Sequence, residues 1–460
     1  MAGAAALVVP VAVVALVIVL GVTLWGRGDL NRFICDGDCG PSNVVPPDSL
    51  SLSPSPAAAT PDASGSGPID PAKLEAAVAP HLDDAVLGDH VGFAATDLDG
   101  TQVAVEGRTT YAPASTTKLL TAFAALATID PGTRFTTKVV RSADGVVLVG
   151  GGDPYLTTKP ARKVDDRVHQ ADLTTLARRT AASLQASGTT SVSLGFDTSL
   201  FTGADQSPGW ESDYVSANIV TPVSALWADQ GVTDGVRARE PAEAAARAFA
   251  RLLTDEGISV KGDPTAATVA ATDEVLAEER SATLSQIVET LVRVSDNQAA
   301  EVVLRHVAIA GGRPADFDGG TQAVKAALDA AGVTTEGLVL TDGSGLSRNN
   351  RISPLTLVGV LREAAAAERT SELTADLPVS GFTGTLVDRF ADLAAARGTV
   401  RAKTGTLTGI HSLAGYATDA DGRPVLFAVM ADRTDNAMPL QAQAALDRAA
   451  AAIASCSCGA

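Results

Sequence analysis

The stretch Pro113-Ala114-Ser115-Thr116-Thr117-Lys118 opens an apolar run, rich in alanine and leucine, that extends from Leu119 to Ile129 and is closed by Asp130-Pro131-Gly132. A proline before the run and a proline with glycine after it predict a helix between them. Ser115 and Lys118 are three residues apart and therefore share one face of that helix. An amine beside a serine hydroxyl can take its proton and make it a good nucleophile. The pair alone is a weak indication, because Ser-x-x-Lys also occurs as an ordinary solvated first turn.

Composition limits the classes of protein to which the chain can belong. Its 460 residues are enough for two or three domains, and with 46% hydrophobic and 19% charged residues it is not a disordered protein. Lysine and arginine number 35 against 53 aspartates and glutamates, which gives a formal net charge of −18. Phosphate repels such a charge, so no nucleic acid partner is predicted.

Four cysteines lie only near the two ends of the chain, at Cys35, Cys39, Cys456 and Cys458. Their number and placement favour disulfides formed in an oxidising compartment. A metal site is the alternative, but no histidine flanks these cysteines. The sequence therefore predicts no metal ion and no other cofactor.

The N-terminal segment from Ala2 to Trp25 is almost wholly apolar and long enough to span a bilayer. We interpret residues 1–26 as a membrane anchor, because no good Ala-x-Ala site follows; a cleaved signal peptide is the alternative. Arg27 and Arg32 follow the segment and no basic residue precedes it, which favours a cytoplasmic C-terminal side. Residues 27–69 are rich in proline, serine and alanine and predict a semi-extended linker.

The body of the chain begins near Ile69 with a helix opened by Asp70-Pro71, which Pro80 should end or kink. A hairpin around Asp99-Gly100 follows, and further strands are predicted between Val400 and Met430 before an alanine-rich closing helix. Strands early and late in the chain, with helices between and outside them, predict an α+β fold: one antiparallel sheet covered by helices on both faces.

Between Phe135 and Asp263 the pattern changes to short strands and glycine-rich turns, interrupted by two helical patches. We interpret residues 135–263 as an inserted, strand-rich second domain that flanks the site without supplying its nucleophile or base. The main domain is then formed by residues 70–134 and 264–455, and residues 456–460 form a cysteine-containing tail.

Two further motifs make the Ser-x-x-Lys pair a specific indication. Ser295-Asp296-Asn297 lies in the helical middle of the chain, and Lys403-Thr404-Gly405-Thr406 lies on a late predicted strand. Ser-x-x-Lys, Ser-Asp-Asn and Lys-Thr-Gly in this order form the motif set of the serine β-lactamases and penicillin-binding proteins. Each motif alone is common, whereas all three in order on the expected elements are specific.

The body resembles the low-molecular-mass class C penicillin-binding proteins, the D-alanyl-D-alanine carboxypeptidase/endopeptidase family. The resemblance covers roughly residues 70 to 455. It extends to Gly150-Gly151-Gly152-Asp153-Pro154, Asp342-Gly343-Ser344-Gly345-Leu346-Ser347, Gly381-Phe382-Thr383-Gly384-Thr385-Leu386 and Arg401-Ala402-Lys403-Thr404-Gly405-Thr406-Leu407. It implies a penicillin-binding/β-lactamase-like transpeptidase domain. The implied substrates are peptidoglycan stem peptides ending in D-Ala-D-Ala, and the implied inhibitors are β-lactams.

The expected catalytic residues are Ser115, Lys118, Ser295 and Asn297. Ser115 would attack the carbonyl between two D-alanines, and Lys118, kept neutral by burial and by nearby Lys403, would be its base. Ser295 would pass the proton to the leaving amine. The Asn297 amide would hold Lys118 and a substrate carbonyl.

The expected substrate-binding residues are Lys403, Thr404, Gly405 and Thr406. Lys403 with the two threonine hydroxyls would meet the terminal carboxylate, although strand alternation places Lys403 on the opposite face from them. Gly405 would let the backbone approach the substrate, and the amides of Ser115 and Thr406 would form an oxyanion hole. Asp153, Asp342 and Arg401 are candidates for orienting the site; the alternative is that they serve turns and a strand end.

Other functions fit less well. A class A β-lactamase would have its first two motifs closer together. It would also have a Glu-x-x-Leu-Asn motif, and the sequence has no such motif between Ser295 and Lys403. An esterase of the Ser-His-Asp type needs a placed histidine, and the chain has five scattered ones: His81, His90, His169, His306 and His411. A non-catalytic wall-binding protein would not need the complete set of chemical groups. The family resemblance and the apolar N-terminus predict a membrane-tethered enzyme whose body lies outside the cytoplasm, against the indication from Arg27 and Arg32.

Overall fold

The structure is a computed structural model, and it describes residues 68–106, 109–143, 145–160, 168, 170–270 and 272–459. The predicted anchor, residues 27–67 of the predicted linker, Cys35, Cys39 and His169 lie outside these residues. Within them, no helix combines the length and the apolar character needed to cross a bilayer. Cys456 and Cys458 form a disulfide with each other.

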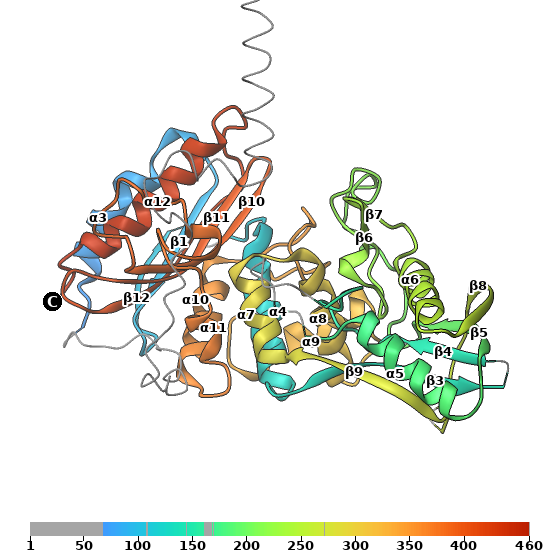
Figure 1. The fold of residues 1–460 in the computed structure, drawn as a ribbon. Coiled ribbons are helices and arrows are strands. Elements are labelled where there is room, and N and C mark those ends of the chain that lie inside the picture. The colour runs from blue at the N-terminus through green and yellow to red at the C-terminus, as the bar shows by residue number, and fades with distance from the viewer. Residues whose placement is uncertain are drawn as a thin grey trace, which may run out of the picture. The chain divides into compact units, whose positions relative to one another are not determined.

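The main sheet has five antiparallel strands in the order β10-β11-β12-β1-β2. Their bounds are Val400–Leu407, Ile410–Thr418, Pro424–Ala431, Val91–Thr96 and Gln102–Glu106. The first strand of the chain thus lies between the last strand and its own hairpin partner, so residues from both ends of the body share one sheet (Figure 1). β10 lies at an edge of this sheet.

Helices cover both faces of this sheet, which confirms the predicted α+β fold. Along β12, Phe427 and Val429 pack into one core, while Leu426, Ala428 and Met430 pack into the other, as the two-residue period of a strand requires. The first core lies under α3 (Pro71–Leu82) and α12 (Pro439–Ser455), which run side by side (Figure 1). α3 begins as predicted, with Asp70 as its N-cap, but it continues past Pro80 to Leu82.

The second core is largely helical and carries the site. It is built from α4 (Thr117–Thr128), α7 (Leu284–Arg293), α8 (Asn297–Ala310), α9 (Phe317–Ala330) and α10 (Pro354–Ala366), with the short α11 (Glu372–Ala375) beside them. α4 contacts α7, α8, α9 and α10 and is buried almost throughout, which explains its uniformly apolar sequence. Short 3₁₀ helices lie in connecting segments along the described chain, at Ala85–Leu87 (η1), Ala114–Thr116 (η2), Asp229–Gly231 (η3) and Gly384–Leu386 (η4).

A second five-stranded sheet, in the order β8-β5-β4-β3-β9, forms the second lobe (residues 134–283). Its strands are Ser259–Ala266, Ser191–Asp197, Gly145–Val149, Arg134–Ser142 and Val275–Thr283, and the lobe adds β6 (Val232–Thr233), β7 (Val236–Arg237), α5 (Leu173–Ala186) and α6 (Pro241–Asp255). β4 with β5 and β5 with β8 pair in parallel. The sheet therefore extends past Asp263, where the sequence analysis ended the insert, because β9 returns to pair with β3.

Candidate active site

Lys118 is the centre of a buried hydrogen-bonded cluster at the start of α4. Ser115 lies in η2, directly before that helix, and the Lys118 side chain is fully buried. The Lys118 Nζ is 2.8 Å from Ser115 Oγ, 2.7 Å from Asn297 Oδ1 and 2.6 Å from the Ser344 carbonyl oxygen. The amide oxygen and the carbonyl oxygen can only accept hydrogen bonds, whereas the serine hydroxyl can also donate. A neutral amine has two N–H bonds and one lone pair, so this geometry directs the lone pair at Ser115.

The surroundings of Lys118 bring its pKa closer to neutral pH, so that a fraction of the amine is neutral there. Burial lowers the pKa of Lys118 to about 8, while the carboxylates of Glu301, Asp342 and Asp296 oppose this change. The sequence analysis named Lys403 as a second cause of the lowered pKa. The repulsion between the two lysines lowers the pKa of Lys403 instead. For Lys118, burial is the cause that lowers its pKa, and the three carboxylates raise it.

Ser295 sits in a tight turn between α7 and α8. Its φ of 60° lies in the left-handed region, which a serine occupies at a cost of about 1–3 kcal/mol. Asp296 caps α8 by accepting from the Ala299 amide, and its own amide donates to the Leu291 carbonyl. This turn places Ser295 and Asn297 side by side at the helix start, so the second predicted motif meets the first.

Lys403 joins the third motif to the second. It is fully buried on β10, and its Nζ donates to Ser295 Oγ at 2.7 Å and to the Thr404 carbonyl at 2.8 Å. Burial, the positive charge of Lys118 and that of Arg389 hold the pKa of Lys403 well below its ordinary value. Because the Ser295 hydroxyl accepts from Lys403, its own proton is free to be donated elsewhere.

The rest of the third motif lines the same edge of the sheet. The Thr404 hydroxyl donates to Thr385 Oγ1 at 3.0 Å, and Thr406 is exposed. A Cβ on Gly405 would lie 2.1 Å from Ser412 Oγ, 2.5 Å from the Pro113 carbonyl and 3.1 Å from the Ser115 amide nitrogen. The space at Gly405 is thus filled by the protein's own chain. This close packing brings β10 against the backbone of Ser115.

The three candidate supporting residues differ in what they contact. The buried Asp342 carboxylate accepts from the Gly345 and Ser347 amides and from the Asn350 and Trp210 side chains, so it shapes the loop that follows it. Asp153 lies after β4, where its carboxylate accepts from the Tyr155 amide. Arg401 on β10 donates to the Ala375 carbonyl.

Two contacts that the sequence analysis did not predict complete the cluster. The Ser344 carbonyl accepts from Lys118, and the buried Glu301 carboxylate accepts from the Gly343 and Ser344 amides, each at 2.9 Å. Glu301 could have been predicted from the sequence. It is a charged residue among apolar ones on a predicted helix, and it lies four residues after Asn297, on the same helix face. A backbone carbonyl gives no such signal.

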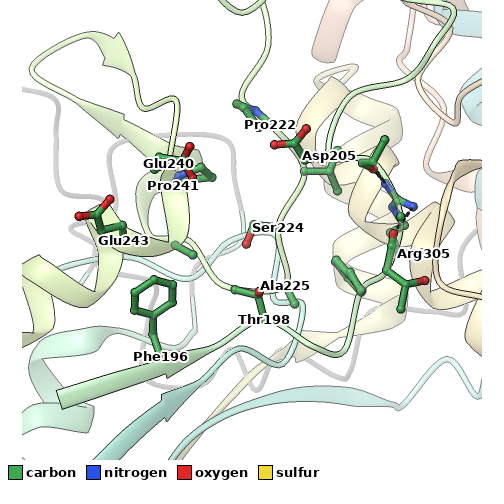
Figure 2. A pocket seen from close by; sticks show the side chains of 16 residues that line it. Phe196, Thr198, Asp205, Pro222, Ser224, Ala225, Glu240, Pro241, Glu243 and Arg305 are labelled. Atoms are coloured by element: carbon green, nitrogen blue, oxygen red, sulfur yellow. Dashed lines mark hydrogen bonds between the residues drawn. The ribbon is translucent and has the colours of Figure 1, made fainter. Parts of the chain in front are cut away.

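Three of the described histidines bond to groups outside this cluster. His411 bonds to Thr434, His306 to the Gly152 carbonyl, and His90 to Asp432. A hollow of about 250 Å³ is also separate: Glu240 and Glu243 lie on one side and Asp205 and Arg305 on the other (Figure 2). None of the predicted site residues lines this hollow.

The fold, and the half-buried serine beside a fully buried lysine, are those of the penicillin-binding class of serine enzymes. A solved structure of penicillin-binding protein 4 from Haemophilus influenzae superposes with a TM-score of 0.67 at 24% identity, covering 83% of this chain and 99% of that chain. At this level of identity the match establishes the fold.

Sequence comparison then defines the family. The profile of the D-Ala-D-Ala carboxypeptidase 3 (S13) family matches residues 74–238 and 232–453. Carboxypeptidase DacB of Mycolicibacterium smegmatis is 35% identical over 440 residues, 91% of this chain and 92% of the relative. A carboxypeptidase of Mycobacterium tuberculosis is 38% identical over 341 residues, 70% of this chain and 71% of the relative. The chain therefore belongs to the D-Ala-D-Ala carboxypeptidase 3 (S13) family, which confirms the resemblance to class C penicillin-binding proteins.

Proposed function

We propose that the protein is a serine D-alanyl-D-alanine carboxypeptidase that trims peptidoglycan stem peptides through an acyl-enzyme on Ser115. The observation that carries this proposal is the buried Lys118 amine, 2.8 Å from Ser115 Oγ, with two acceptor-only oxygens on its remaining bonds. Family membership supports the substrate class. β-Lactams acylate the same serine, since they present a reactive amide to the same groups.

Acylation begins when Ser115 Oγ attacks the carbonyl carbon between the two D-alanines and Lys118 takes the hydroxyl proton. The negative charge that develops on the carbonyl oxygen meets backbone amides of Ser115 and Thr406, which close packing at Gly405 brings together. The C–N bond then breaks, and the Ser295 hydroxyl, which accepts from Lys403, gives its proton to the leaving amine. Ser295 recovers a proton from the Lys118–Lys403 pair, and free D-alanine leaves.

Deacylation repeats these steps with water in place of the serine hydroxyl. Lys118 takes a proton from the water that attacks the ester carbonyl, and the Ser115 oxygen is reprotonated as the C–O bond breaks. Asn297 has its amide oxygen on Lys118, so its NH₂ group is the part that can donate to the substrate.

The experiment combines intact-protein mass spectrometry with a release assay. Incubation with a penicillin should add the mass of one acyl group, and a defined pentapeptide ending in D-Ala-D-Ala should release free D-alanine. A cross-linked peptide dimer, assayed in parallel, measures endopeptidase activity. The absence of both acylation and D-alanine release would favour a non-catalytic wall-binding protein, and rapid turnover of penicillin without D-alanine release would favour a β-lactamase.

We also propose that the enzyme works outside the cytoplasmic membrane, tethered by the apolar segment from Ala2 to Trp25. The proline-, serine- and alanine-rich residues 27–69 would give it reach toward the wall. Protease treatment of intact spheroplasts provides the test: a body that is digested supports this location, and a protected body contradicts it.

A further inference from the structure

Glu301 is one of two carboxylates bonded to the loop backbone that Lys118 contacts: it accepts from the Gly343 and Ser344 amides, whereas Asp342 accepts from the Gly345 amide. Glu301 lies on α8, one turn after Asn297, so both residues face the same side of the helix. Its side chain is 1% exposed, and its two oxygens accept from the Gly343 and Ser344 amides at 2.9 Å each. Burial of a carboxylate is costly unless its oxygens are hydrogen-bonded, and here both are.

This clamp fixes a loop that packs against the nucleophile from behind. Gly345 has a φ of 83°, and a Cβ at this position would lie 1.9 Å from the Ala114 carbonyl oxygen. The Thr121 hydroxyl, one turn after Lys118 on α4, donates to the Gly343 carbonyl at 2.8 Å. The loop therefore has little freedom to shift, and its Ser344 carbonyl is held against the Lys118 amine.

The position of that carbonyl decides where the lone pair of Lys118 points. Ser344 O and Asn297 Oδ1 occupy the two N–H bonds of the neutral amine, and the third direction is then Ser115 Oγ. Asn297 and Glu301 belong to one helix, so α8 controls both acceptors: one directly, the other through the loop. Without the clamp, the bond from the Gly345 amide to Asp342 would be the remaining carboxylate contact on this peptide. The Ser344 carbonyl would then be held less firmly, and the amine could donate a hydrogen bond to Ser115.

The charge of Glu301 adds a second effect. When Lys118 takes the serine proton it becomes an ammonium ion in a buried site, and a nearby carboxylate stabilises that ion. Glu301 raises the pKa of Lys118 more than Asp342 or Asp296 does. Burial and Asp342 raise the pKa of Glu301 itself, and its two amide bonds oppose this change by favouring the carboxylate.

Other charged groups face this pair from the neighbouring elements. Lys118 faces Asp296 at the start of α8, Asp342 in the loop, and Lys403 on β10. Glu301 faces Asp342 and also Arg305 on its own helix. The pKa of Lys118 therefore depends on Glu301 together with Asp342 and Asp296.

We infer that Glu301 is a positioning residue for the proposed acyl transfer: it holds the Ser344 carbonyl so that the Lys118 lone pair faces Ser115, and it stabilises the ammonium ion that forms. This inference rests on the proposed function. It assigns a specific part of the reaction to a residue that does not touch the substrate.

Two substitutions separate the clamp from the charge. Glu301→Gln keeps the size of the side chain, removes the charge, and replaces one acceptor oxygen with an NH₂ group. Glu301→Asp keeps the charge, but its side chain is one methylene shorter and cannot reach both amides. The exposed Glu336→Gln is the matched control. The readout is the second-order rate of acylation by a chromogenic β-lactam from pH 5.5 to 10, per mole of folded protein.

For Glu301→Gln we expect the plateau rate to fall about tenfold or more, and the midpoint of the pH profile to move to lower pH. For Glu301→Asp we expect a similar loss of rate with the midpoint closer to that of the wild type, and for the control no change. A purely structural role would reduce the amount of folded protein but would not move the midpoint.

A Glu301→Gln protein with an unshifted midpoint or an unchanged plateau rate overturns the inference. If this variant does not fold, Glu301→Asp decides the question, because a wild-type rate in that variant overturns the clamp. If the wild-type protein itself is not acylated, the proposed function is wrong. This result differs from the two outcomes for the variants, which test the role of Glu301 alone.

Discussion

Lys118 on α4 and Lys403 on β10 are both fully buried, yet the charges around them have opposite signs. Three carboxylates, led by Glu301, raise the pKa of Lys118 against the effect of burial. The charges acting on Lys403 are those of Lys118 and Arg389, which lower its pKa further. The α4 region is therefore suited to holding a transferred proton. The β10 region has an excess of positive charge, and a bound carboxylate would neutralise it.

Replacing the nucleophile beside Lys118 should have the largest effect on acylation. We expect Ser115→Ala to abolish both penicillin labelling and D-alanine release, because no other hydroxyl bonded to Lys118 can form the ester. Thermal unfolding should show that the fold persists. Labelling that survives the substitution would mean that the nucleophile is another residue, and the comparison of the two lysines would lose its basis.

Removal of the base should have the next largest effect. We expect Lys118→Ala to slow acylation by roughly 10²- to 10⁴-fold, since the serine hydroxyl then has no amine to take its proton. Stopped-flow acylation with the acid and the ester form of one penicillin should show equal losses. The exposed Lys261→Ala is the control. A loss confined to the acid form would transfer the carboxylate-binding role to Lys118.

A smaller and more selective loss is expected from the β10 lysine. A charge-assisted hydrogen bond contributes about 1.5–3 kcal/mol, so Lys403→Ala should slow acylation by the free acid about ten- to a hundredfold. The ester, which has no carboxylate, should lose much less. If the second-order rates for acid and ester fall equally, Lys403 acts on the chemistry through Ser295 and not on recognition.

The smallest effect is the pH dependence of the wild-type protein. Only neutral Lys118 can act as base, and the neutral fraction rises as pH rises through its pKa of about 8. Acylation by the ester form should therefore increase about fivefold between pH 7 and pH 8 and reach a plateau above pH 9. Lys403→Ala should keep the same midpoint, because burial and not Lys403 lowers the pKa of Lys118. A higher midpoint in that variant would restore Lys403 as a cause.

Local patterns in the sequence predicted the elements that hold the site. The run after Ser115 predicted α4, Asp70 predicted the start of α3, and the three motifs predicted which distant segments meet. These signals are local, since capping, turn residues and apolar periodicity act within a few residues. They also predicted the alternation that places Lys403 opposite Thr404.

What the sequence did not predict depends on long-range packing. The edge of the second lobe follows from the pairing of β9 with β3, and no residue near Asp263 encodes that pairing. The Ser344 carbonyl becomes a site group only because Glu301 and Asp342 fold its loop against α4. The reason that Gly405 must be a glycine likewise depends on Pro113, far away in the sequence, and on Ser412, its partner on the neighbouring strand.

The pairing of β1 with β12 has a consequence for the order in which the protein is made. Ribosomes produce the chain from its N-terminus, so Ser115 and Lys118 exist long before β10 and β12 do. Until those last strands emerge, the main sheet cannot close and β10 cannot pack against the η2 backbone at Ser115. Ser295 then also lacks its hydrogen bond from Lys403. Because of this strand order, a chain that is still being synthesised carries its nucleophile in an incomplete active site.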